Sequence, residues 1–144
     1  MRIALVSCVK AKRATPTPAR DLYTSTLFQG LRAYAIAHAD QWFILSAEYG
    51  LLRPDEVVLP YERTLNRMRQ PDRIRWAQRV QEQLVAVLPM GAEVILLAGA
   101  RYREHITPFL RASGFSVSIP LEHLSIGKQL QRLKLETDRL VRSV

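Results

Sequence analysis

A single α/β domain spanning residues 1–144, with one mostly parallel sheet between two layers of helices, is predicted by this sequence. Two observations lead to this fold class. Apolar runs without strict alternation recur along the chain, which is typical of strands covered on both faces. Apolar residues at helical spacing separate each run from the next, as the crossover connections of a parallel sheet require.

Four apolar runs are the predicted strands. The first three are continuous, whereas the fourth is weaker and alternates with polar residues. In chain order they are Arg2–Ser7, Trp42–Ser46, Glu93–Leu97 and Phe115–Ile119. We therefore expect a three-layer α/β/α fold with a four-stranded, Rossmann-like sheet, and strands in the order 2-1-3-4.

Four helices are predicted after these strands. Their apolar faces lie within residues 27–38, 74–88, 106–110 and 126–140. The first helix is predicted to begin after Ser25, and Pro71 is suited to the first turn of the second. Gly114 is expected to end the third helix in a left-handed conformation. The segment between the second strand and its helix is unusually long for such a connection, so we expect a structureless loop that forms the wall of a cleft.

The charge balance of the chain favours a polyanionic partner. Its 21 Lys and Arg against 13 Asp and Glu give a net charge of +8, an excess common among nucleic-acid-binding proteins. No apolar run approaches the roughly 18 residues of a membrane span. The three His residues lack metal-ligand spacing, and no glycine-rich phosphate-binding motif is present. We expect a cytoplasmic protein with no membrane partner, no metal and no cofactor.

Polar residues follow all four predicted strands. In an open α/β sheet, ligands bind outside the carboxyl ends of the strands, which is the edge where these residues lie. The segments read SCVKAKR, SAEYG, AGARYRE and PLEHLS. They contribute hydroxyls, phenols, cations, carboxylates and a glycine, namely Ser7, Ser46, Tyr49, Tyr102, Lys10, Lys12, Arg101, Glu48, Glu122 and Gly99. Four loops of matching polarity predict one binding site at this edge.

Charge is divided within the long segment. Four acids and one Arg lie between Glu48 and Glu62, whereas six Arg and one Asp lie between Arg63 and Arg79. An acidic pocket beside basic shoulders suits an enzyme that holds phosphates and performs acid–base chemistry. The expected phosphate contacts are Arg13, Arg63, Arg67 and Arg69. Arg75 and Arg79 fit a solvated helix face instead.

Four strings of the sequence resemble a family of small bacterial and phage domains of unknown function: SCVKAK, ARDLYTSTLF, WFILSAEYGLLRPDEVVLPYERTL and IGKQLQRL. More distantly, the chain is similar to the YaaA peroxide-stress proteins, which bind DNA, and to domains attached to tRNA base-exchange enzymes. This resemblance implies nucleic-acid or nucleobase chemistry. It also implies a site at the matched positions, which are Ser7, Cys8, Lys10, Lys12, Tyr23, Ser25, Ser46, Glu48, Tyr49, Gly50, Asp55 and Tyr61.

The leading functional prediction is an enzyme that acts on a nucleobase or its N-glycosidic bond, as a DNA glycosylase does. Asp55 or Glu48 would be the acid–base group, and Tyr23, Tyr49 or Tyr61 would stack a base. For Cys8, a packing role is favoured over a nucleophile, because no His lies near it in sequence. Two alternatives stay open: a non-catalytic DNA- or RNA-binding module, and an interaction protein that forms a homodimer through its C-terminal helix.

Overall fold

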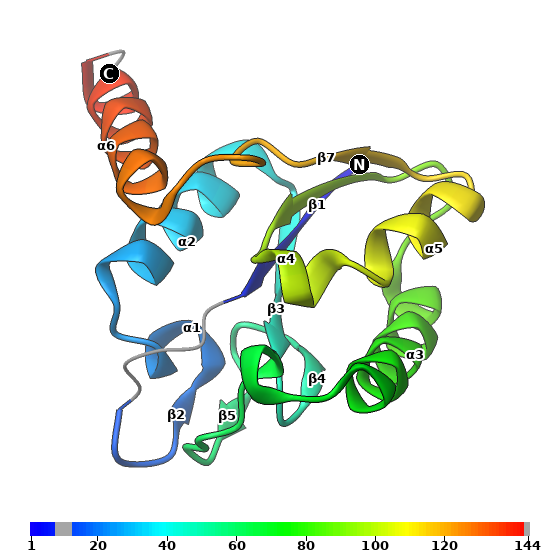
Figure 1. Ribbon diagram of the computed structural model, residues 1–144. Coiled ribbons are helices and arrows are strands. Elements are labelled where there is room, and N and C mark those ends of the chain that lie inside the picture. Colours follow the sequence, from blue (N-terminus) through cyan, green and yellow to red (C-terminus); the bar gives the residue numbers. More distant parts are fainter. Residues whose placement is uncertain (8–12, 143–144) are drawn as a thin grey trace.

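The computed structural model describes residues 1–7 and 13–142, without the side chains of 140–142, and contains a five-stranded sheet in the order β4-β3-β1-β6-β7 (Figure 1). The strands are β1 (Arg2–Ser7), β3 (Gln41–Ser46), β4 (Gly50–Leu52), β6 (Glu93–Leu97) and β7 (Ser116–Ser118). All neighbours are parallel except β4, which is antiparallel to β3. The predicted α/β class and the order of the four predicted strands are confirmed, whereas the expected number of strands is wrong by one.

The fifth strand forms because the chain turns back directly after β3. Ser46 pairs with Gly50, and Gly50 has a φ of +74°, a left-handed conformation that glycine adopts without strain. Leu52 then returns to the core opposite Ile44. The expectation of a long structureless loop is therefore wrong, because this segment contains β4, β5 (Val57–Val58) and the 3₁₀ helix η1 (Leu65–Arg67).

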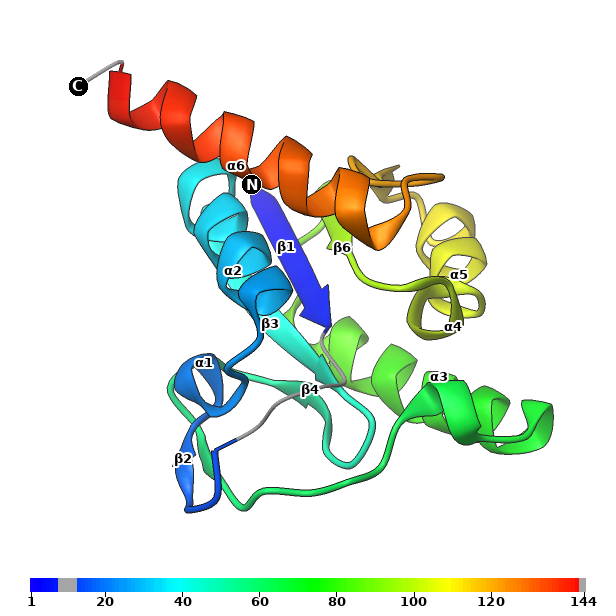
Figure 2. The ribbon, with the colours of Figure 1, turned by 60° about the vertical axis from the view of Figure 1, so that its left-hand side comes forward.

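Helices cover both faces of the main sheet, as predicted (Figures 1 and 2). One face carries α1 (Ala19–Leu22), α2 (Thr26–His38) and α6 (Ile126–Arg142), and the other carries α3 (Gln70–Val87), α4 (Ala100–Arg103) and α5 (Ile106–Ala112). Successive side chains of β1 point to opposite faces of the sheet and so belong to two separate parts of the core. Ile3 and Leu5 pack with α3 and α5, whereas Ala4 and Val6 pack with α2.

The helix ends follow the predicted signals. Ser25 caps α2, since its hydroxyl accepts a hydrogen bond from the backbone N–H of Phe28 at 3.1 Å. Pro71 lies in the first turn of α3, and Gly114 has a φ of +88° just after α5. Leu133 of α6 is buried against α2, where a Cβ on Gly30 would lie 3.1 Å from it. No helix in the described part of the chain has the length and apolar character of a membrane span.

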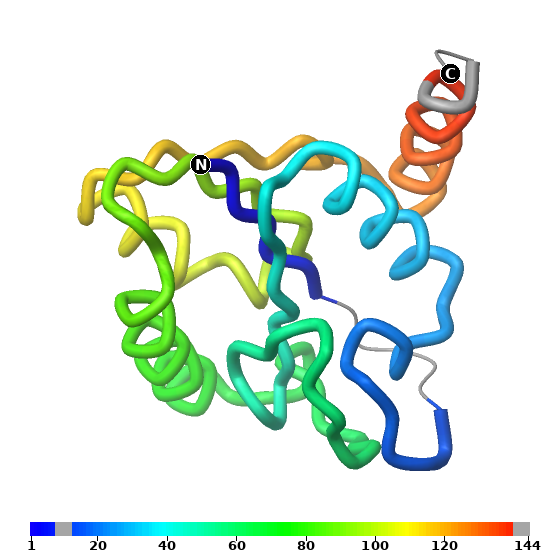
Figure 3. The backbone as a smooth tube through the Cα atoms, turned by 180° about the vertical axis from the view of Figure 1, so that it is seen from behind, coloured from blue at the N-terminus to red at the C-terminus, as the bar shows by residue number. Residues whose placement is uncertain are grey.

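A small second sheet lies beyond the carboxyl end of β1. Its strands, β2 (Thr17–Pro18) and β5, are antiparallel, and Figures 1 and 3 show them beside each other below the main sheet. The backbone N–H of Ala19 donates to the carbonyl of Glu56 at 2.7 Å, which joins the segment after β1 to the segment after β3. The two long connections are thus held together at the edge where α/β proteins bind ligands.

Candidate functional site

A pocket of about 560 Å³ opens at the carboxyl edge of the sheet, between residues 62–68 and the first half of α3. Its walls combine apolar groups with charged ones. The lining residues are Ala47, Glu62, Arg63, Thr64, Arg67, Met68, Asp72, Arg75, Trp76 and Arg79. Four arginines and two carboxylates therefore surround it, which leaves two positive charges in excess. The volume is in the range of pockets that hold one small molecule.

The helical side of the pocket is a single stripe of α3. Asp72, Arg75, Trp76 and Arg79 follow one another at spacings that place them on one helix face. Trp76 is buried, and its Nε1–H donates to the carbonyl of Ser46 at 2.9 Å, which seats this stripe on the end of β3. Arg75 and Arg79 are exposed, as a solvated helix face predicts, but they also line the pocket, and their spacing around Trp76 is the signal that could have revealed this second role.

The four arginines differ in what they already contact. Arg63 forms an ion pair with Glu48 at 3.4 Å between Nε and Oε2, and Arg75 pairs with Asp72 in the preceding turn. Arg79 donates from Nη2 to the carbonyl oxygen of Glu48 at 2.8 Å. Within the described residues, no ion pair of Arg67 is present. Exposed pairs of this kind contribute little stability, so a stronger anion can replace these carboxylates.

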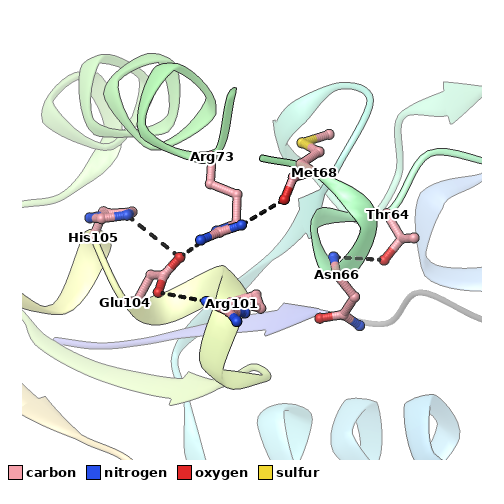
Figure 4. Close-up of polar contacts among 7 residues, drawn as sticks. All are labelled: Thr64, Asn66, Met68, Arg73, Arg101, Glu104 and His105. Atoms are coloured by element: carbon pink, nitrogen blue, oxygen red, sulfur yellow. Dashed lines mark hydrogen bonds and ion pairs between the residues drawn. The ribbon is translucent and has the colours of Figure 1, made fainter. Parts of the chain in front are cut away.

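Arg73 holds the end of the 62–68 segment through Met68 (Figure 4). Its Nη1 donates to the carbonyl of Met68 at 2.6 Å, and its Nε donates to Oε1 of Glu104 at 2.6 Å. Only 12% of the Arg73 side chain is exposed, whereas 30% of the Glu104 side chain is, so the guanidinium is the better shielded partner of this pair. Arg101 and His105 also face Glu104, each at 3.5 Å. The contact therefore ties η1 and α3 to the turn between α4 and α5.

Glu104→Gln should destabilise the protein by about 1–2 kcal/mol at pH 7, because a charged acceptor is lost opposite a shielded guanidinium. Burial acts to raise the pKa of the Glu104 carboxyl, but the hydrogen bond and charge of Arg73 outweigh it, so the pKa lies below its ordinary value. A depressed pKa stabilises the fold above the ordinary value of about 4.3. The difference in the free energy of unfolding between wild type and Glu104→Gln should thus shrink as the pH falls through the lowered pKa of Glu104 in the folded state. Urea denaturation at pH 7 and pH 3 measures it, and an unchanged difference would contradict this.

The turn after β3 uses Ser46 internally. Ser46 is fully buried, and its hydroxyl accepts hydrogen bonds from the backbone N–H groups of Glu48 at 3.2 Å and Tyr49 at 3.0 Å. The expectation that this hydroxyl faces a ligand is wrong, because a strand-end serine can equally well cap the turn that follows it.

The predicted stacking tyrosines pack on one another. The hydroxyls of Tyr23 and Tyr61 are 2.5 Å apart, and Tyr61 meets Tyr49 edge to face with ring centroids 5.7 Å apart. Tyr49 donates to the carbonyl of Leu59 at 2.9 Å. Burial, followed by the neighbouring Tyr61, raises the pKa of Tyr23 far above its ordinary value. Tyr23 is only 2% exposed, so the expectation that its ring stacks a base is wrong. The three tyrosines instead join the end of α1 to the turn between β3 and β4 and to the segment after β5.

Other predicted site residues near the sheet edge have partners within the fold. Ser7 is buried, and its hydroxyl accepts from the backbone N–H of Gly99 at 3.3 Å. Gly99 has a φ of −65°, a conformation open to other residues, and a Cβ there would meet nothing within 4 Å, so this position does not require glycine. Tyr102 is buried against Trp76 with ring centroids 5.6 Å apart, and it belongs to the core.

Four further predicted residues lie away from the pocket walls. Asp55 is exposed in the turn between β4 and β5. Arg13 is exposed, with its Nε donating to the carbonyl of Asp21 at 2.9 Å. Arg69 is exposed at the N-terminus of α3, and Gly50 is buried beneath Arg79 and Gln83. Cys8, Lys10 and Lys12 lie outside the described residues.

The edge site thus differs in composition from the one expected. Ser7, Ser46, Asp55 and Tyr61 do not line the pocket, and Glu48 contacts it only through Arg63 and Arg79. Arg63 and Arg67 are the predicted residues that do line it. In the described ranges, no three His, Cys, Asp or Glu side chains are grouped to hold a metal ion. The arrangement is suited to binding an anion.

Comparison with known proteins assigns this chain to a family. Residues 3–135 match the family described as Family of unknown function (DUF6884). The uncharacterized protein YfjM of Bacillus subtilis (strain 168) is 40% identical over 63 residues, which are 40% of this chain and 42% of that protein. A UPF0246 protein of Salinispora tropica is 29% identical over 106 residues, which are 69% of this chain and 40% of that protein. The chain spans about two fifths of the length of each, and no solved structure matches it. The resemblance to an unknown-function family and to YaaA-like proteins is confirmed.

Proposed function

Since the chain belongs to this family of unknown function, we propose a function from the pocket itself: it binds nucleic acid or a nucleotide by holding phosphate oxygens with Arg63, Arg67, Arg75 and Arg79. The observation that carries this proposal is the convergence of four guanidinium groups from two segments on one pocket. Guanidinium is planar, stays charged at all physiological pH values and matches two phosphate oxygens at once.

The setting of these arginines strengthens their effect on an anion. The pocket backs onto Ala47 and Trp76, which are buried, so one side of a bound phosphate would face apolar groups instead of water. Charge interactions strengthen where water is excluded. The net charge of +8 on the whole chain adds attraction for a polyanion at longer range.

Binding to labelled single- and double-stranded oligonucleotides should weaken steeply as salt rises, because each phosphate contact releases condensed counterions. With two to four arginines each contacting one phosphate, the slope of log affinity against log salt is expected to be about −1.8 to −3.6 for a duplex and about −1.4 to −2.8 for a single strand. Fluorescence anisotropy at a series of KCl concentrations measures this slope. Affinity that does not change with salt, or the absence of binding to nucleic acids and nucleotides, would refute the proposal.

An enzymatic version of this function rests on Glu48. Its carboxylate is 38% exposed and contacts Arg63, so it lies beside the proposed phosphate site and is accessible to a ligand. In that version Glu48 performs acid–base chemistry on a nucleobase or its N-glycosidic bond. Asp55 is a weaker candidate, because it lies in the exposed turn between β4 and β5, whereas Glu48 contacts the lining residues Arg63 and Arg79. Release of free base from an oligonucleotide distinguishes this version from a binding module.

A homodimer through α6 is the third alternative. Leu133, at the centre of its apolar face, is already packed on α2. Ile126 and Leu135 remain exposed, but nine positions separate them, which places them on opposite sides of the helix. The apolar face of α6 thus supports the fold of one chain, and light scattering distinguishes monomer from dimer.

A further inference from the structure

We propose that the pocket selects a phosphomonoester over an internal phosphodiester, so that its ligand is the phosphorylated end of a nucleic-acid strand or a mononucleotide. This inference rests on the proposed function and names the ligand class of the same site. A phosphomonoester carries a charge of about −1.5 to −2 at pH 7, because its second pKa is about 6. An internal phosphodiester carries a single charge. A pocket that discriminates by charge will therefore bind the monoester more tightly than the diester.

The charge of the pocket itself matches the monoester. Once a ligand displaces Glu48 from Arg63, the lining arginines exceed the lining carboxylates by two, so a dianion would neutralise the excess and a monoanion would leave one charge uncompensated. Because one side of the pocket is formed by buried apolar residues, an uncompensated charge there is less well solvated than one on an open surface. The dianion is the better complement.

The internal ion pairs act in the same direction. Glu48 already occupies Arg63, and Asp72 already occupies Arg75. A monoanionic diester that displaces Glu48 exchanges one singly charged partner of Arg63 for another and gains little. A monoester brings a second charge and more acceptor oxygens, so it can bind Arg63 and Arg67 together. Glu48 and Asp72 thus compete with the ligand for Arg63 and Arg75, and a singly charged ligand does not displace them.

The size of the pocket favours a strand end or a single nucleotide over a continuous strand. A volume of about 560 Å³ is typical of a site for one small molecule, whereas a strand bound through internal phosphates requires a groove that continues on both sides. Met68, Trp76 and Ala47 line the pocket together with the arginines. These apolar groups offer contact area to the sugar or base that carries the phosphate.

Two oligonucleotides of identical sequence, one with a 5′-phosphate and one with a 5′-hydroxyl, test this inference. Wild type should bind the phosphorylated strand about five- to tenfold more tightly at moderate salt, since only that strand carries a dianion. Glu48→Gln and Asp72→Asn should each bind the hydroxyl strand more tightly and reduce the preference towards one. Glu82→Gln, which removes an exposed α3 carboxylate outside the pocket, is the matched control and should keep the wild-type preference.

Each outcome has a distinct meaning. If a nucleoside monophosphate, but not the nucleoside, displaces the 5′-phosphorylated strand, this would support the inference and identify a single nucleotide as a sufficient ligand. Competition only by phosphorylated strands would support it with a strand end as the ligand. Equal binding of both strands by wild type would overturn the inference and leave the proposed function standing. No binding of strand or nucleotide would overturn both.

Discussion

Gly50→Val should destabilise the protein by about 3 kcal/mol, which is a large share of the ~5–15 kcal/mol that holds a typical domain. Gly50 has a φ of +74°, where a side chain with a Cβ costs about 1–2 kcal/mol. A Cβ there would also lie 2.4 Å from Oε1 of Gln83. That oxygen accepts a hydrogen bond from the backbone N–H of Leu51 at 2.8 Å, so its displacement also loses this bond. Thermal and urea unfolding measure the change.

Matched substitutions separate the two causes. Gly91 has a similar φ of +77°, but nothing lies within 4 Å of the position of its Cβ. Gly91→Val should therefore cost only the backbone strain of about 1–2 kcal/mol. Glu62→Gln, at an exposed position, should change stability by less than about 0.5 kcal/mol. If Gly50→Val were no more destabilising than Gly91→Val, the packing of Gln83 and Arg79 over this turn would not matter to the fold.

Replacing Arg63, Arg67 and Arg75 together with Ala should reduce affinity for nucleic acid at least about tenfold at 0.1 M salt and flatten its salt dependence. If each arginine contacts one phosphate of a duplex, the slope of log affinity against log salt should fall by about 2.7. For a single strand the expected fall is about 2.1. Anisotropy titrations at several salt concentrations measure both quantities, and an unaltered melting temperature verifies the fold.

A control with the same change in total charge is available on the other surfaces. Arg111, Arg132 and Arg139 are exposed on α5 and α6 and do not line the pocket. Their joint replacement by Ala should lower affinity only modestly, through the weaker field of the whole protein. Arg69→Ala should likewise have a small effect, because Arg69 lies outside the pocket walls. Equal losses in both triple variants would show that binding depends on net charge instead of the pocket.

Sequence patterns predicted the main sheet because burial on both faces leaves a clear signal. Residues 3–6 of β1 are apolar without interruption, and the helical patterns between such runs require crossovers, which limits the strand order. β4 was missed because three residues give no periodicity, and its glycine also suits an irregular loop. The hydroxyl of Ser46 was misassigned for a related reason, since a polar strand end is compatible with both a ligand and a turn.

The pocket was only partly predictable. Arg63 and Arg67 stood out because they precede the predicted apolar face of the helix. Arg75 and Arg79 look like ordinary solvated positions until the 62–68 segment is seen to cross in front of them. Arg73 holds that segment by donating to the carbonyl of Met68, five residues before it, and Arg73 is itself held by Glu104, 31 residues after it. A pairing at that distance in sequence has no local pattern.

The two outer strands of the main sheet, β4 and β7, have a consequence for how the protein behaves at high concentration. An outer strand presents unpaired backbone groups that can recruit another chain into a growing fibre. Here both are only three residues long, whereas the longer apolar strands lie inside the sheet. Each edge strand therefore offers only a short row of backbone groups with which a second molecule could pair. Self-association by strand addition is limited by this length, while the apolar runs that are most prone to it stay enclosed.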